Sequence, residues 1–203
     1  MDFRGLESQV RVVYFRNVLN ATELLERAGA IDISEGRAVS DADAVPPSPQ
    51  STSRCAVLDL SNVASDLQVR GAVLKAILST VPDSGFRGKT VSFRSNVIFN
   101  MSVSGRVTEA VNQFNVTALS SSVAVVGWVD EAGSPASLQE FEALVAAVQG
   151  TAFEPSLLLS DPEFVSDERR QRLVKLYKLA PLEASLGTLE SSVITRLAVK
   201  EIM

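Results

Sequence analysis

The chain has 203 residues, of which 46% are hydrophobic, and a formal net charge of −5. This length and hydrophobic content suffice for one globular domain with a sizeable core. The sequence has no histidine and a single cysteine, which excludes Ser-His-Asp and Cys-His catalysis, an internal disulfide and most zinc sites. The negative net charge argues against broad nucleic-acid binding, so any nucleic-acid site must be local or shared with a partner.

The first residues, MDFRGLESQV, lack the basic region and the apolar core of a secretory signal, and no apolar run in the chain could span a bilayer. We therefore expect an intracellular, soluble protein with no membrane association. Cys55 stands next to Ala, Val and Leu, so we expect a small buried hydrophobic residue there and not a nucleophile.

The first two predicted elements are a strand and a short helix. VRVVYF at 10–15 is rich in β-branched and aromatic residues, which is typical of a buried strand. A helix is predicted over 21–28, where Asn20 and Glu23 have the spacing of a capping box and Gly29 suits a left-handed stop. Its apolar stripe comprises Leu24, Leu25 and Ala28.

A polar insertion separates these elements from the next pair. Residues 35–54 contain no Leu, Ile or aromatic residue and are rich in Pro and Ser, which predicts a disordered surface segment. CAVLDL at 55–60 then predicts a second strand, and a helix follows until Pro82. We expect one face of that helix to carry Val63, Leu67, Leu74, Ile77 and Leu78.

The segment from Val91 to Met101 fits two structures. Val91, Phe93, Val97, Phe99 and Met101 alternate as in a strand, whereas Val91, Ile98 and Met101 also fit a helix, so periodicity leaves both open. After a Ser/Gly break, Ser104 is predicted to cap a second helix, and Asn115 takes the position that often needs a left-handed residue. The apolar residues of this helix are Val107, Ala110, Val111 and Phe114.

Another strand and helix follow. VAVVGWV at 123–129 predicts a strand, and Ser137 with Glu140 forms a capping box for a helix that Gly150 ends. The predicted inward-facing residues of this helix are Leu138, Phe141, Leu144, Val145 and Val148.

Two further helices are predicted in the last quarter. One starts near Ser166, with Asp167 and Glu168 in its first turn and lysines in its last. Its segment RRQRLVKLYK at 169–178 shows the spacing of an ordinary amphipathic helix. The other runs over 188–201. The elements together indicate an α+β fold: one small, mainly antiparallel sheet covered by several helices, in a single domain over 1–203.

Two stretches are candidate sites from their residues alone. GFRGKT at 85–90 ends like a phosphate-binding P-loop, but Asp83 stands where the first glycine is needed, so a basic loop is the favoured interpretation. Around the Ser/Gly break, Arg87, Lys89, Arg94 and Arg106 lie within twenty residues that contain no acid. This basic patch could hold a phosphate or an unpaired base, although the same polar residues could simply cap a helix-hinge-helix.

Two segments carry a family resemblance. VIFNMSVSGRVTEAVNQFNV and LVKLYKLAPLEASLGTLESSVITRLAVKEI resemble the Cgi family of KEOPS (EKC) subunits, which usually has Gly where this chain has Asn115. The resemblance implies a non-catalytic subunit without a cofactor, present in nucleus and cytoplasm, that binds and stimulates a Bud-type (PRPK) atypical kinase. It also implies contact with the other KEOPS/EKC subunits through the kinase, binding of the tRNA 3′ CCA end, and a role in threonylcarbamoyladenosine modification of tRNA.

The resemblance assigns the tRNA end to the Ser/Gly break: Arg94, Asn100, Ser102, Gly105, Arg106 and Val107. We expect the kinase to bind the C-terminal helix, which is unusually apolar for a chain end: Leu189, Val193, Ile194, Leu197 and Ile202. No metal site is expected. The alternatives are a small nucleotide-binding enzyme that uses GFRGKT and a stand-alone protein-interaction adaptor.

Overall fold

The computed structural model describes residues 9–27, 53–80, 88–90, 92–129, 135–181, 183 and 188–200. The predicted insertion at 35–54 lies outside these ranges except for Ser53 and Arg54, and so do Arg87 and Ile202.

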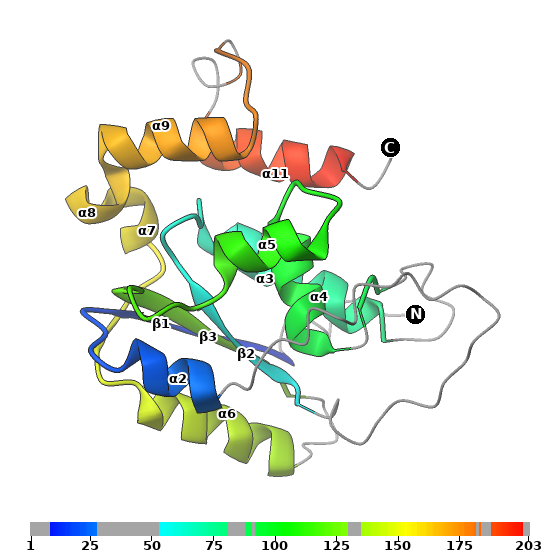
Figure 1. Ribbon diagram of the computed structural model, residues 1–203, viewed down its shortest axis with the longest axis vertical. Helices are drawn as coiled ribbons and strands as arrows, with labels where there is room; N and C mark the ends of the chain where they lie inside the picture. The colour runs from blue at the N-terminus through cyan, green and yellow to red at the C-terminus, as the bar shows by residue number, and fades with distance from the viewer. Residues whose placement is uncertain are drawn as a thin grey trace, which may run out of the picture.

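The centre of the fold is a four-stranded antiparallel sheet with the order β2-β3-β1-β4 (Figure 1). The strands are β1 (Val10–Arg16), β2 (Cys55–Asp59), β3 (Ser122–Trp128) and β4 (Thr151–Phe153). The three predicted strands are confirmed. β4 was missed because it has only 3 residues, too few to show an alternation of apolar and polar positions.

Helices cover both faces of the sheet, as Figure 1 shows. On one face lie α2 (Ala21–Arg27) and α6 (Pro135–Ala147). On the other lie α3 (Asp66–Leu78), α4 (Phe93–Met101) and α5 (Val107–Phe114). The last quarter adds α7 (Leu157–Ser160), α8 (Pro162–Val165), α9 (Asp167–Leu176) and α11 (Leu189–Val199), and α9 and α11 run along the outer side of that second layer. The α+β fold predicted from the sequence is thus confirmed.

Alternate residues of β3 point into two separate cores. Ala124 and Val126 belong to the core under α3, α4 and α5, whereas Val123 and Val125 belong to the core under α2 and α6. Gly127 faces the second core at close range, because a Cβ there would lie 2.7 Å from a ring carbon of Phe141. This alternation lets one short strand bury side chains on both faces.

Cys55 lies in the second core, as expected for a small hydrophobic residue. Its thiol is buried, and burial raises its pKa to about 12. At neutral pH it therefore remains a protonated thiol, which is a poor nucleophile.

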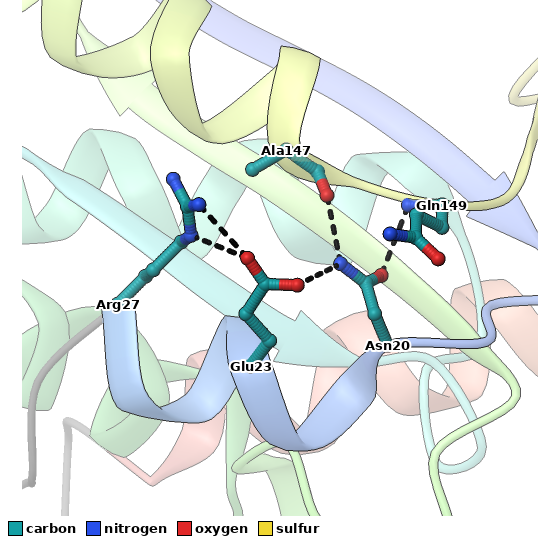
Figure 2. A network of polar contacts seen from close by, with 5 residues as sticks. All are labelled: Asn20, Glu23, Arg27, Ala147 and Gln149. Atoms are coloured by element: carbon teal, nitrogen blue, oxygen red, sulfur yellow. Dashed lines mark hydrogen bonds and ion pairs between the residues drawn. The ribbon is translucent and has the colours of Figure 1, made fainter.

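Asn20 joins α2 to the end of α6 (Figure 2). Its side-chain nitrogen donates to Glu23 Oε2 at 3.1 Å and to the carbonyl oxygen of Ala147 at 2.8 Å, while its Oδ1 accepts from the backbone N–H of Gln149 at 2.9 Å. Arg27 completes the network with an ion pair to Glu23. Asn20 and Glu23 therefore contact each other through their side chains and do not form the predicted capping box, because Asn20 Oδ1 accepts from Gln149 and ties α2 to α6.

Two of the predicted helix faces are correct except at one residue each, because Phe141 and Leu144 of α6 and Ile77 of α3 are buried as expected. α6 begins at Pro135, so Ser137 lies inside the helix instead of capping it, and Leu138 is exposed. Proline at the first position supplies the helical φ and lacks the N–H that would be unsatisfied there. In α3, Leu67 is 55% exposed, whereas the buried face carries Val69 and Val73. The error arose because Val63 precedes the helix, whose N-cap is Ser65.

The ambiguous segment before the break is a helix. α4 begins after Ser92, whose hydroxyl accepts from the N–H of Ser95 at 3.1 Å. Every residue from Phe93 to Phe99 is buried, including Asn96. A helix buried on all sides has no polar face, which explains why its periodicity could not separate helix from strand.

Candidate functional site

The break between α4 and α5 is a loop ordered by its own hydroxyl groups. Ser102 is fully buried, donates to Gln113 Oε1 at 2.7 Å and accepts from the N–H of Ser104 at 3.0 Å. The hydroxyl of Ser104 in turn accepts from the N–H of Arg106 at 3.1 Å. Gly105 and Arg106 are exposed on the loop, so this ordered turn presents them to solvent.

Both predicted ends of α5 are corrected by the structure. The N-cap is Arg106, without a side-chain capping bond, instead of Ser104. Asn115 has φ −74° and ψ 145°, so it is extended and not left-handed. The reason is that the chain continues directly into a β-bridge between Asn115 and Leu58, which needs extended backbone.

Arg106 has an acidic neighbour on the loop. Its Nη1 lies 3.3 Å from Glu109 Oε1, and the Arg106 and Glu109 side chains are 79% and 48% exposed. The hydroxyl of Ser104 donates to Glu109 Oε2 at 2.6 Å, and this bond, together with the charge of Arg106, lowers the pKa of Glu109. Because an exposed ion pair of this kind is weak, an incoming phosphate could replace Glu109 at Arg106.

The residues that the sequence assigned to the break differ in their exposure to solvent. Gly105 and Arg106 are exposed, and Val107 is partly exposed. Ser102 and Arg94 are buried; Arg94 Nη2 donates to Asn115 Oδ1 at 2.7 Å, and burial lowers the pKa of Arg94 to about 10. The remaining residue, Asn100, is partly buried, and its side-chain nitrogen donates to the carbonyl oxygen of Ala72 in α3 at 3.3 Å.

Residues 88–90, the part of GFRGKT that the structure describes, form a turn that is bonded to the side chain of Asn96. The Oδ1 atom of Asn96 accepts from the N–H groups of Lys89 and Thr90 at 3.0 and 3.1 Å, and its Nδ2 donates to the carbonyl oxygen of Thr90 at 2.9 Å. A P-loop uses such N–H groups to bind phosphate. Here the two groups are already bonded within the chain, which disfavours a nucleotide site at this turn.

Lys200 links the C-terminal helix to the break. Its Nζ donates to the carbonyl oxygens of Phe99 at 2.9 Å and of Ser102 at 2.8 Å, and it lies 3.5 Å from the centroid of the Phe99 ring. A cation at the carbonyl end of α4 is favoured by the helix dipole. Sequence reasoning missed this role because Lys200 lies 98 positions from Ser102.

Two buried side chains, Gln68 and Tyr177, form a polar network at the same C-terminal end of α4. Gln68 Nε2 donates to the carbonyl oxygen of Met101 at 3.0 Å and to Tyr177 Oη at 2.5 Å. The Tyr177 hydroxyl donates to the carbonyl oxygen of Asn62 at 2.9 Å, and burial raises the pKa of Tyr177. α3, α4 and α9 are thereby joined by polar contacts within the core.

The C-terminal helix turns part of its apolar stripe inward. Val193 and Leu197 are buried in the core and Leu189 packs against it, so the structure places them differently from the exposed apolar surface expected from the sequence. Ile194 is partly exposed, and Val199 is 39% exposed. The outer side of α11 therefore offers a smaller apolar surface than its sequence suggested.

A family model described as kinase binding protein CGI-121 matches residues 15–201. The chain belongs to this family. The match runs from the first strand to the residue after Lys200, and it therefore includes both the break and α11. It confirms the resemblance inferred from the sequence at the level of the family and of kinase binding.

In this CGI-121 family member, Arg169 is a buried cation that sequence reasoning treated as part of an ordinary amphipathic helix. It is 6% exposed and donates to the carbonyl oxygens of Leu60 at 3.1 Å and Ser61 at 3.4 Å, and also to those of Val63 and Phe164. Burial lowers the pKa of Arg169 to about 10, so it remains charged at neutral pH. The guanidinium joins α9 to the end of β2 and to α8.

Within the described ranges, no three His, Cys, Asp or Glu side chains are grouped so that they could hold a metal ion. None of the helices described there is long and apolar enough to cross a membrane.

Proposed function

We propose that the chain is a non-catalytic regulatory subunit of the KEOPS/EKC complex that binds and stimulates a Bud-type (PRPK) atypical kinase. The observation that carries this proposal is the match to a family of kinase binding proteins over residues 15–201. In this role it needs no cofactor, reaches the other subunits through the kinase, works in nucleus and cytoplasm, and supports threonylcarbamoyladenosine modification of tRNA.

The outer side of α11 is the proposed kinase contact. Ile194 and Val199 supply its apolar surface, with the exposed Ala198 beside them. Val193 and Leu197 act from beneath, because they pack α11 against the core and so fix the direction of this side. Apolar residues at helical spacing are the usual anchors when a helix face docks onto a partner.

Ile194→Glu is expected to abolish co-purification with the kinase while the protein stays folded. The side chain is partly exposed, so a carboxylate can reach water there but would be desolvated in an apolar interface. Leu138→Glu, at an exposed position of α6 on the opposite side of the sheet, is the matched control and should retain the kinase. A folded Ile194→Glu protein that still co-purifies would exclude this side of α11.

The break is the proposed site for the tRNA 3′ CCA end. Arg106 supplies an exposed guanidinium for a phosphate, and Val107 supplies a partly exposed apolar neighbour for a base. A Cβ at Gly105 would meet nothing within 4 Å, so a ligand can approach the backbone there. One cation at a small site fits a protein of net charge −5 that holds only the end of a tRNA while its partners hold the rest.

Binding of deacylated tRNA with and without its CCA end, at one stated low salt concentration, tests this site. We expect the CCA-dependent part of the affinity to fall about tenfold in Arg106→Glu, which reverses the charge facing the phosphate. Glu109→Gln should increase the affinity, because it removes the carboxylate that competes for Arg106. Kinase co-purification should be unchanged in both variants.

Equal binding of intact and CCA-truncated tRNA would contradict the RNA part of the proposal. The protein would then be a kinase adaptor whose Ser/Gly break has only a structural role. Parallel loss of tRNA and kinase binding in Arg106→Glu would indicate misfolding instead.

A further inference from the structure

The last turn of α11 has little apolar packing of its own. Within the described residues 188–200, Leu197 is the last buried side chain, and Ala198 and Val199 after it are exposed. Lys200 is the C-cap of the helix. Helix ends fray, and this end is held by few apolar contacts. The position of the Lys200 ammonium group therefore depends on a turn that other contacts can stabilise.

Lys200 fixes the point at which the chain leaves α4. Its two bonds, described above, go to the carbonyl oxygens of Phe99 and Ser102. Ser102 is the C-cap of α4 and has extended backbone, with φ −96° and ψ 146°. Because the peptide unit is planar, a bond to the carbonyl oxygen of Ser102 fixes the plane of the whole peptide group that follows. Lys200 thus sets the direction in which the break begins.

Two successive hydroxyl bonds lead from Ser102 to Arg106. The hydroxyl of Ser102 accepts from the N–H of Ser104 at 3.0 Å, and the hydroxyl of Ser104 accepts from the N–H of Arg106 at 3.1 Å. Both bonds form only if the chain leaves Ser102 in the right direction. A series of contacts therefore joins Lys200 in α11 to Arg106, the exposed cation of the proposed tRNA site.

The other end of this series lies next to the proposed kinase contact. Ala198 and Val199 belong to the outer side of α11 and directly precede Lys200. A kinase that packs against these two residues restricts the turn that carries Lys200. Order that is already imposed at one site lowers the entropy cost of ordering a site connected to it.

We propose that Lys200 is a positioning residue that couples the kinase contact on α11 to the tRNA site at the break. Bound kinase holds the last turn of α11, Lys200 holds the carbonyl end of α4, and the ordered break binds the tRNA end more tightly. Because a coupling free energy is reciprocal, the bound tRNA end strengthens kinase binding by the same factor. This coupling rests on the proposed function of both sites.

Hydrogen–deuterium exchange of the full chain, with and without saturating kinase, tests the coupling. The N–H groups of Ser104 and Arg106 are bonded to hydroxyl oxygens, so their exchange reports whether the break is ordered. We expect bound kinase to slow their exchange about fivefold or more, the lower end of usual coupling factors. The N–H of Asn96, which is bonded to the carbonyl oxygen of Ser92 at the start of α4, should be unaffected.

Lys200→Met should still bind the kinase, but the kinase should no longer slow exchange in the break. Arg196→Met is the matched control, because it removes the same charge from α11 but its partner is Glu183, at 2.7 Å, and not α4. The slowing should persist in this control. A purely structural role of Lys200 would speed exchange equally in free and bound protein and would leave the effect of the kinase intact.

A short single-stranded RNA that ends in CCA measures the consequence for binding. Its affinity for the parent protein should rise about fivefold when kinase is bound, and Lys200→Met should abolish this gain. Binding of the same RNA to the kinase alone gives the background.

The inference is overturned if kinase does not slow exchange at Ser104 and Arg106 in the parent protein. It is also overturned if the slowing is unchanged in Lys200→Met, because the kinase would then cover the break directly. Slowed exchange that depends on Lys200, without any CCA-dependent binding, would contradict the proposed tRNA site and leave the coupling standing.

Discussion

Replacing Arg169 with methionine is expected to lower the free energy of unfolding by about 3–5 kcal/mol, because several buried carbonyl oxygens would lose their donor at about 1–3 kcal/mol each. Methionine can fill part of the volume but cannot donate a hydrogen bond. The carbonyl oxygens of Leu60 and Val63 would lose the donor that Arg169 supplies, as would that of Phe164. Buried carbonyls that lose their donors destabilise the fold.

Urea denaturation followed by circular dichroism measures this effect. Arg170→Met, at the exposed neighbouring position of the same helix, is the matched control and should change the free energy of unfolding by less than about 1 kcal/mol. Arg169→Lys should fall between the two, because one ammonium group cannot reach carbonyls on several sides. An Arg169→Met protein as stable as the control would show that the carbonyls find other donors.

Val193→Glu is expected to destabilise the fold by about 4 kcal/mol or more. A fully buried carboxyl group must either ionise away from water or stay protonated at neutral pH through a strongly raised pKa, and both cost about this much free energy. Val193 is completely buried in the main core, beneath the helix whose outer side is proposed to bind the kinase. Loss of the kinase from this variant would therefore follow from loss of the fold.

Thr195→Glu places the same charge on an exposed position of α11 and should leave the free energy of unfolding within about 0.5 kcal/mol of the parent value. The comparison uses thermal and urea unfolding of both variants. If Val193→Glu were as stable as Thr195→Glu, the C-terminal helix could not be packed on the core as observed.

The sequence predicted correctly those helices and strands whose ends are determined by residues within or next to the element. Ser166 caps α9 by accepting from the N–H of Arg169, and the strands at 10–15 and 123–129 appear within one residue of their predicted limits. The predictions failed where contacts distant in sequence decide the structure. α4 is buried on every side, and Asn115 is extended because it pairs with Leu58, and neither fact is encoded nearby.

The same division applies to the candidate sites. The sequence placed the break correctly, and its hydroxyls do order a loop that presents Arg106. It could not show that Arg94 points inward, because an arginine in a basic stretch has the same local pattern whether buried or exposed. Arg169 was missed for the same reason: its four acceptors come from residues 60–63 and from Phe164.

The bond from Lys200 to the end of α4 also sets an order of events during synthesis. Because the ribosome releases the chain from the N-terminus, α4 and the loop after it emerge long before Lys200 does. Until then, the carbonyl oxygens of Phe99 and Ser102 lack their shared ammonium donor. The local bonds of the loop that carries Arg106 can form earlier, but its last two contacts to α11 wait until Lys200 has left the ribosome.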